Sequence, residues 1–337
     1  MNGLLLQSLL DYALFLAETL TVLAGVALLL VLVLRSRQGK DTGEQLEVVD
    51  LDAQYRALMD TLKSASLTAK AYKAFRKAER KREKELAAAE DERPRLFVIE
   101  FKGDIRASEV GALRIMITAL LLEAKAGDAV LVRLDNAGGL VSEHGLAASQ
   151  LARLRAAGIP LTVAVDKVAA SGGYLMACVA DRLIAAPFAI IGSIGVLAEL
   201  PNFHRLLERY GVDFELHTAG EYKRTLTLFG ENTDEGRQKL RQQLAETHQL
   251  FQGFVAEYRP GLALDQVATG DYWHGSRAVE LGLVDAIQTS DDFLLEASRS
   301  RKLLKLVSRV RKKPLERLMS SIQNALFWIL RRADPVE

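Results

Sequence analysis

Apolar and polar positions alternate with two periods along the middle of the chain. Short apolar runs at residues 96–101, 129–135 and 161–165 have the length and content of buried strands. The segments between them, 108–126 and 136–157, carry apolar positions at helical spacing, the second after a glycine-containing loop. Strands and helices that alternate in this way predict an α/β domain with a largely parallel sheet covered by helices.

The pattern continues with weaker signals as far as residue 290. Residues 182–186, 213–217 and 283–287 are predicted to be short strands. A long helix is predicted over 235–259, where Pro260-Gly261 ends it, and a short helix is predicted over 276–281.

An apolar segment near the N-terminus predicts a membrane anchor. Residues 12–34 contain Glu18 as their one charge and are followed by Arg35-Ser-Arg-Gln-Gly-Lys40. Such a run is long enough to cross a bilayer, and the basic flank is typical of a stop-transfer signal. A cleaved signal peptide fits less well because no Lys or Arg precedes the apolar core. A buried globular helix is the alternative.

The segments on either side of the predicted domain are helical in composition. Residues 41–95 show no strand pattern, and their Ala, Leu, Lys, Arg and Glu content predicts one or two exposed helices. Residues 291–337 form a basic tail with an amphipathic stretch at 315–332, which we expect to contact a membrane interface, another subunit or its own domain. The expected organisation is therefore an anchor (1–40), a charged helical linker (41–95), a folded domain (96–290) and this tail.

Charge and cysteine content narrow the class of function. The net charge of +1 hides two basic segments, 63–95 and 299–332, on either side of an acidic middle. Because both lie beside apolar helical sequence, they favour an anionic membrane surface or a partner helix over nucleic acid. Cys178 is the only cysteine, so neither a disulfide nor a cysteine metal site can form. With no His-Glu-x-x-His motif and no Walker loop, we expect no metal and no nucleotide cofactor.

Ser171 is the candidate nucleophile. It lies in Ala170-Ser-Gly-Gly-Tyr174, between the strand at 161–165 and an apolar helix. A tight strand-to-helix turn exposes a hydroxyl and directs amide groups of the helix start at one point, where an oxyanion can form. The alternative is that Ser171 only caps the helix, as serine often does at that position.

A serine nucleophile needs a base. None of the five histidines stands in a recognisable triad, although one of them follows the Gly138-Gly139 turn closely: His144, His204, His217, His248 and His274. A lysine can also act as base where an apolar environment favours its neutral form. The candidate is Lys223 in Gly220-Glu-Tyr-Lys-Arg224, which taken alone is equally an ordinary surface charge.

Four motifs together resemble one family. Ala170-Ser-Gly-Gly-Tyr174, Asn136-Ala-Gly-Gly139, Ile191-Gly-Ser-Ile-Gly-Val196 and Gly220-Glu-Tyr-Lys-Arg224, at these separations, resemble the signal peptide peptidase A family of serine-lysine proteases. The apolar N-terminus and charged extension resemble its SohB branch. The resemblance implies a caseinolytic-protease/crotonase-like β-α spiral.

The resemblance also implies a role for each matching residue. Ser171 matches the nucleophile, Lys223 the general base, and Ser193 a hydroxyl that holds the lysine. The amides of Gly139 and Gly172 match the oxyanion hole. One departure is Ala137, which stands where the family often carries a proline.

Partners and location follow from the same resemblance. It implies a homo-oligomeric ring or bowl in a bacterial inner membrane that cleaves signal-peptide remnants or unfolded and membrane-derived peptides, with the extended substrate beside the Gly139 loop. The basic flank of the anchor places the domain in the cytoplasm, whereas relatives of this kind are also described in the periplasm. Two other functions stay open: a catalytically inactive oligomeric membrane scaffold, and an acyl-CoA hydratase or isomerase, against which Ser171 and a downstream lysine argue.

Overall fold

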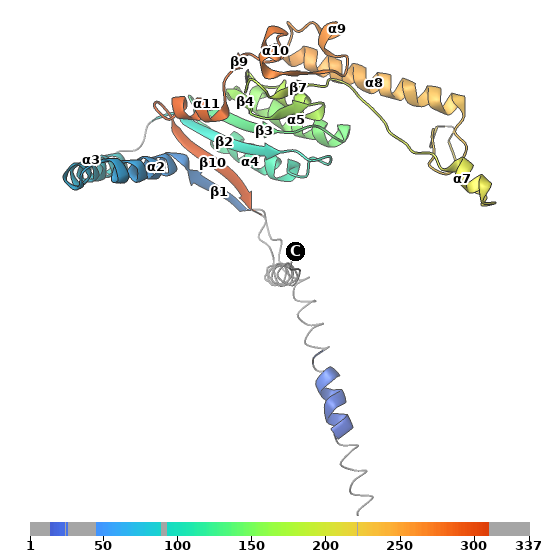
Figure 1. The fold of residues 1–337 in the computed structure, drawn as a ribbon, viewed down its shortest axis with the longest axis horizontal. Helices are drawn as coiled ribbons and strands as arrows, with labels where there is room; N and C mark the ends of the chain where they lie inside the picture. Colours follow the sequence, from blue (N-terminus) through green and yellow to red (C-terminus); the bar gives the residue numbers. More distant parts are fainter. Residues whose placement is uncertain (1–13, 24, 26–44, 89–92, 221, 310–337) are drawn as a thin grey trace, which may run out of the picture. The chain divides into compact units, whose positions relative to one another are not determined.

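A computed structural model describes residues 14–23, 25, 45–88, 93–220 and 222–309. Residues 46–308 form one compact unit, called the body below. The helices and strands of the body are labelled in Figure 1.

A mixed α/β architecture is built on a seven-stranded sheet with the strand order β1-β10-β2-β3-β4-β6-β9. The strands are β1 (Gln45–Asp50), β2 (Arg95–Lys102), β3 (Ala129–Asp135), β4 (Leu161–Val165), β6 (Arg182–Ala185), β9 (Ala286–Ile287) and β10 (Lys302–Arg309). All pairs from β10 to β9 are parallel, which confirms the predicted sheet type.

A second, three-stranded sheet was not predicted from the sequence. It consists of β5 (Val168–Ala170), β7 (Ile190–Gly192) and β8 (Tyr272–His274), in that order. β5 pairs with β7 in parallel and β7 pairs with β8 in antiparallel orientation. Each strand has three residues, too few to show an alternating pattern. An isolated bridge between Asn136 and Ala169 joins this sheet to the end of β3.

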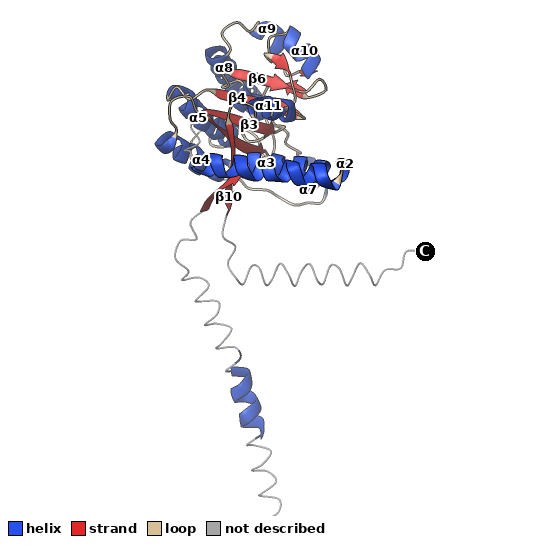
Figure 2. Cartoon of the chain, turned by 90° about the vertical axis from the view of Figure 1, so that its left-hand side faces the viewer, coloured by secondary structure: helices blue, strands red, loops and turns tan. Residues whose placement is uncertain are grey.

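Helices cover the large sheet (Figure 2). The helices are α2 (Leu51–Ser66), α3 (Ala69–Ala88), α4 (Val110–Glu123), α5 (Val141–Ala156), α6 (Gly172–Ala177), α7 (His204–Arg209), α8 (Asp234–Tyr258), α9 (Leu264–Val267), α10 (Gly275–Glu280) and α11 (Ser290–Ala297). Side chains of β2 divide between two buried clusters. Ile99 joins the larger one with α4, α5 and α6, and Val98 joins the smaller one with Leu51 of α2 and Leu294 of α11. The sheet is therefore buried on both faces, as parallel sheets are.

The two outermost predicted boundaries of the domain are wrong. Residues 41–95 were predicted to contain one or two helices and no strand, yet β1 precedes α2 and extends the sheet beyond β10. The domain was also predicted to end at residue 290, yet β10 pairs with β2 from Lys302↔Arg95 to Leu306↔Ile99. Both strands pair with segments that lie far away in sequence. No local sequence pattern therefore predicted β1 or β10. The two linker helices themselves are present, as α2 and α3.

Residues 197–233 form an extended segment of the body, called the arm below. It contains α7 and lies beside the first turns of α8, away from the sheet (Figure 1). The Phe229 ring contacts the rings of Phe203 and Phe214 and so joins the two ends of the arm to its middle. The strand predicted over 213–217 is absent, and these residues are exposed and irregular.

The chain ends lie largely outside the described residues. No helix of the described part is both long and apolar enough to cross a membrane. Of the predicted anchor, residues 14–23 are helical, and most of the rest of 1–40 is not described. The helix predicted over 315–332 lies wholly outside the described residues.

Candidate active site

Ser171 stands between β5 and α6 in a strained backbone conformation. Its φ is 52° and its ψ is −121°, values that residues with a side chain rarely adopt. Such a conformation costs about 1–3 kcal/mol and is typical of functional turns. The Ser171 side chain makes no capping hydrogen bond to α6. Ser171 thus occupies the N-cap position of α6, but its hydroxyl does not serve as the cap.

Ser193 follows β7 as Ser171 follows β5. The parallel pairing of the two strands ends at Ala170↔Gly192, so the next residues in register are the two serines. The Ser171 amide donates to the Gly192 carbonyl over 2.8 Å, and the Ser193 amide donates to the Asp271 carbonyl over 2.7 Å. The structure thus brings together two candidate residues that are 22 positions apart in sequence.

The predicted oxyanion glycines lie beside Ser171. A Cβ on Gly138 would approach the Gly172 amide nitrogen to 2.8 Å, so the glycine turn lies directly against the start of α6. The φ of 93° at Gly138 also favours glycine. Gly172 is the first residue of α6 and so has no acceptor within its own helix. The Gly139 amide donates to no group in the part of the chain that the structure describes.

A cavity of about 320 Å³ opens beside these groups. Ser171, Gly172 and Gly139 line it, together with apolar side chains from α6, α8 and the loop after β7: Leu175, Val196, Leu250, Phe251 and Phe254. A hydroxyl, the amides of Gly139 and Gly172 and an apolar hollow thus meet at one place. Such an arrangement can bind an apolar side chain while the hydroxyl attacks a neighbouring carbonyl.

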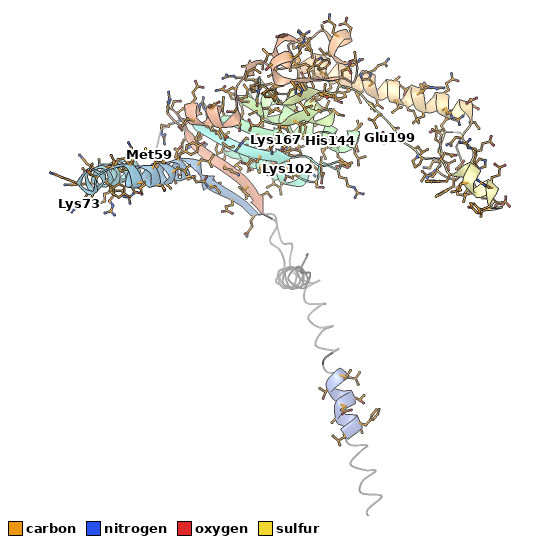
Figure 3. All side chains as sticks on the ribbon, viewed as in Figure 1. Met59, Lys73, Lys102, His144, Lys167 and Glu199 are labelled. Atoms are coloured by element: carbon orange, nitrogen blue, oxygen red, sulfur yellow. The ribbon has the colours of Figure 1, made fainter. Side chains whose placement is uncertain are left out.

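Lys223 does not reach this cavity within the chain. It is exposed on the arm, next to Tyr222, whose ring lies 4.9 Å from the Lys239 ammonium. Lys239 precedes Thr247, which lines the cavity, by eight residues of α8, a rise of about 12 Å. Figure 3 shows the arm extending away from the rest of the body near Glu199, whereas His144 lies in that remaining part. The single chain therefore brings Ser193, Gly139 and Gly172 to Ser171, but not Lys223.

Two histidines have roles that the sequence did not reveal. His144 is fully buried in α5 and lines the cavity. His248 of α8 donates from Nε2 to the Ile194 carbonyl over 3.1 Å and so holds the backbone next to Ser193. Both histidines contact main-chain groups around the site. The spacing of residues along the sequence could not predict these contacts.

Cys178 has the structural role expected of it. It is buried in the core, and burial raises the pKa of its thiol to about 12. A thiol with such a pKa is protonated and unreactive at neutral pH. No cluster of three metal-ligating side chains occurs among the described residues.

Two family descriptions match almost the whole chain. Residues 7–151 match "Peptidase family S49 N-terminal" and residues 153–304 match "Peptidase family S49". A probable protease SohB from Haemophilus influenzae is 44% identical over 334 residues, which is 95% of each chain. A probable protease SohB from Buchnera aphidicola subsp. Schlechtendalia chinensis is 45% identical over 300 residues, covering 85% of this chain and 98% of its own length. A solved 1510-N membrane-bound stomatin-specific protease mutant with a substrate peptide is 14% identical, covers 69% of this chain and 99% of its own, and has a TM-score of 0.43.

Proposed function

Because the chain belongs to peptidase family S49, we propose that it is a serine endopeptidase with a Ser171-Lys223 dyad. Ser171 attacks the scissile carbonyl, and Lys223 takes the hydroxyl proton and returns it to the leaving amine. Ser193 holds the amine by a hydrogen bond. Membership of a peptidase family and relatives named as proteases support the reaction class.

The observation that carries the proposal is the strained turn at Ser171 beside the amides of Gly139 and Gly172. An oxyanion that forms at the attacked carbonyl would lie between the amides of Gly139 and Gly172. One well-placed donor of this kind contributes about 3 kcal/mol to lowering the barrier. A helix cap would need neither the φ of 52° nor the glycine turn against Gly172.

We place the lysine of each site on the arm of a neighbouring copy of the chain. Lys223 is exposed on the arm, and the arm also exposes large apolar side chains: Leu197, Leu200, Leu206, Tyr210, Val212 and Leu216. Such side chains are typical of a surface that another subunit covers. Burial of Lys223 against a second chain would favour the neutral amine, which is the form that can accept a proton. The proposed assembly is therefore a closed homo-oligomer with shared sites.

The cavity indicates the class of substrate. Its lining is mostly apolar, with Ser142, Ser149 and Thr247 as further polar side chains, so it suits an apolar or small side chain next to the cleaved bond. Short membrane-derived or unfolded peptides carry such side chains in an accessible form. We propose that residues 1–40 anchor the enzyme in a bacterial inner membrane, because residues 12–34 are apolar for long enough to span it.

Two measurements on the full chain test the proposal. A serine-reactive fluorophosphonate should label wild-type protein at Ser171 and should not label Ser171→Ala. Ser171→Ala and Lys223→Ala chains, each inactive alone, should recover about a quarter of wild-type activity when mixed equally, since a head-to-tail ring then contains some intact sites. If wild-type protein is labelled but the mixed variants recover no activity, Ser171 and Lys223 of one site belong to the same chain. A folded protein that neither reacts with the probe nor cleaves peptides would favour the inactive scaffold.

A further inference from the structure

We propose that Asn136 and His144 form a buried pair that sets the width of the oxyanion hole. The inference rests on the proposed function, because it assigns these residues to positioning the Gly139 and Gly172 amides. Neither residue contributes a group to the reaction. Each instead fixes one wall of the hole.

Asn136 fixes the wall that carries the glycine turn. Its Oδ1 accepts the Gly138 amide hydrogen over 2.9 Å. Its main chain is held in turn by β5, since its amide donates to Val168 over 2.9 Å and its carbonyl accepts from Ala170 over 3.1 Å. Asn136 is 1% exposed, so water does not compete for these bonds. The turn before Gly139 is therefore tied to the strand that leads into Ser171.

His144 fixes the wall that carries Gly172. A Cβ built on Gly172 would lie 2.5 Å from Cγ and 2.7 Å from Cδ2 of the imidazole, so the ring packs directly against the backbone of Gly172. Only glycine fits that space. The ring is fully buried and cannot move without moving the first turn of α6.

One hydrogen bond joins the two walls. His144 Nε2 lies 3.2 Å from Asn136 Oδ1, and His144 Nδ1 lies 3.0 Å from the Leu140 carbonyl. Both oxygens can only accept, and a neutral ring has one N–H, which can donate to only one of them. The link between the walls is the tautomer with the hydrogen on Nε2. Asn136 Oδ1 then accepts from Gly138 and His144 together. The separation of the two oxyanion donors is set by this shared oxygen.

Such a pair acts on the transition state more than on substrate binding. The oxyanion forms only during attack, so a misplaced amide lowers kcat and leaves KM nearly unchanged. Substitution of a residue that serves folding alone would lower the melting temperature without lowering kcat selectively relative to KM. The matched substitutions are His144→Phe, which keeps a planar ring against Gly172, and His144→Gln, which keeps a donor for Asn136.

The test measures kcat, KM and the rate of fluorophosphonate labelling of Ser171 in the full chain. His144→Phe should lose on the order of ten- to a hundredfold in kcat and in labelling rate at unchanged KM, and His144→Gln should recover part of the loss. His274→Phe is the control, because His274 is exposed in β8 and contacts the Phe188 carbonyl instead. Ring nitrogen NMR shifts of His144 should report a hydrogen on Nε2.

A second pair keeps the test decisive if His144→Phe does not fold. Asn136→Asp keeps an oxygen acceptor at the same place, whereas Asn136→Leu has a similar shape and no acceptor. A smaller loss of kcat for Asp than for Leu, despite the negative charge that Asp brings, supports the proposal. The proposal is overturned if Asn136→Asp and Asn136→Leu have equal kcat. It is also overturned if His144→Phe keeps wild-type kcat, or if the His144 ring carries its hydrogen on Nδ1 alone. Failure of the dyad itself would look different, since wild-type protein would then show no labelling at all.

Discussion

Ser171 and Ser193 occupy equivalent positions at the ends of two paired strands. Each is the first residue after its strand, and each has a positive φ, 52° and 49° respectively. The Ser171 amide bonds to the residue just before Ser193. The nucleophile and its predicted supporting hydroxyl are thus placed by the same strand pairing, and both carry backbone strain.

Replacing Ser171 should separate stability from activity. Ser171→Ala keeps the strained φ, whereas Ser171→Gly relieves it. We expect the free energy of unfolding of Ser171→Gly to exceed that of Ser171→Ala by about 1 kcal/mol, with both variants inactive. Urea denaturation of the two proteins measures the difference. Equal stabilities would mean that the turn is not strained.

Removing the proposed base should be more severe than removing its partner hydroxyl. Lys223→Ala should abolish peptide hydrolysis, a loss of at least about a thousandfold, while Ser193→Ala should slow it by about ten- to a hundredfold. Lys125→Ala is a suitable control, because Lys125 is exposed at the end of α4. Peptide cleavage assays at saturating substrate give the ranking. Full activity in Lys223→Ala would remove the lysine from the mechanism.

Filling the apolar cavity should change substrate preference. Leu175 lines it one turn of α6 after Ser171, to whose carbonyl its amide donates over 3.0 Å. Leu175→Phe reduces the space for a substrate side chain. We expect kcat/KM for peptides with leucine at the cleavage point to fall about tenfold relative to peptides with alanine there. A matched pair of peptides measures the ratio, and an unchanged ratio would place the specificity pocket elsewhere.

The ion pair between Arg95 and the buried Asp128 should set part of the acid stability. Burial of Asp128 opposes its charged form, but the Arg95 guanidinium, 2.6 Å away, and the amides of Lys125 and Arg95 outweigh it and hold the pKa of the carboxyl below its usual value. Because the folded state lowers this pKa, the stabilisation is complete above the pKa of an unfolded aspartate. It is lost as pH falls through the folded value.

Asp128→Asn should therefore cost about 3 kcal/mol of unfolding free energy at neutral pH and less in acid. Denaturation at several pH values measures both effects. Asp234→Asn is the control, because Asp234 is 99% exposed and its ion pair with Arg237 should contribute little. A cost for Asp128→Asn that stays constant with pH would contradict this assignment.

The sequence predicted the features that depend on neighbours along the chain. The strands at 129–135 and 161–165 were predicted at their observed bounds, because both are buried apolar runs. The turn at Ser171 was predicted from a strand, a serine and two glycines in succession. The motifs also led to Gly139 and Gly172, which line one cavity with Ser171, and to Ser193, which follows β7 as Ser171 follows β5.

The sequence did not predict features that depend on distant partners. β5 and β7 are three residues long and exist because they pair with each other. The role of His144 depends on Asn136, eight residues earlier, and on Gly172, in another element. Helical spacing marks His144 as a position on α5 and says nothing of the ring's neighbours.

The first and last strands of the body are neighbours. β1 adjoins β10 at the edge of the large sheet, and Figure 1 shows both of their outer ends at the same corner. A force applied to the two ends of the chain would separate β1 from β10 starting at one end and would break their hydrogen bonds one after another. Because β10 also pairs with β2, the load would pass to that second strand pair before it reached the turn that carries Ser171.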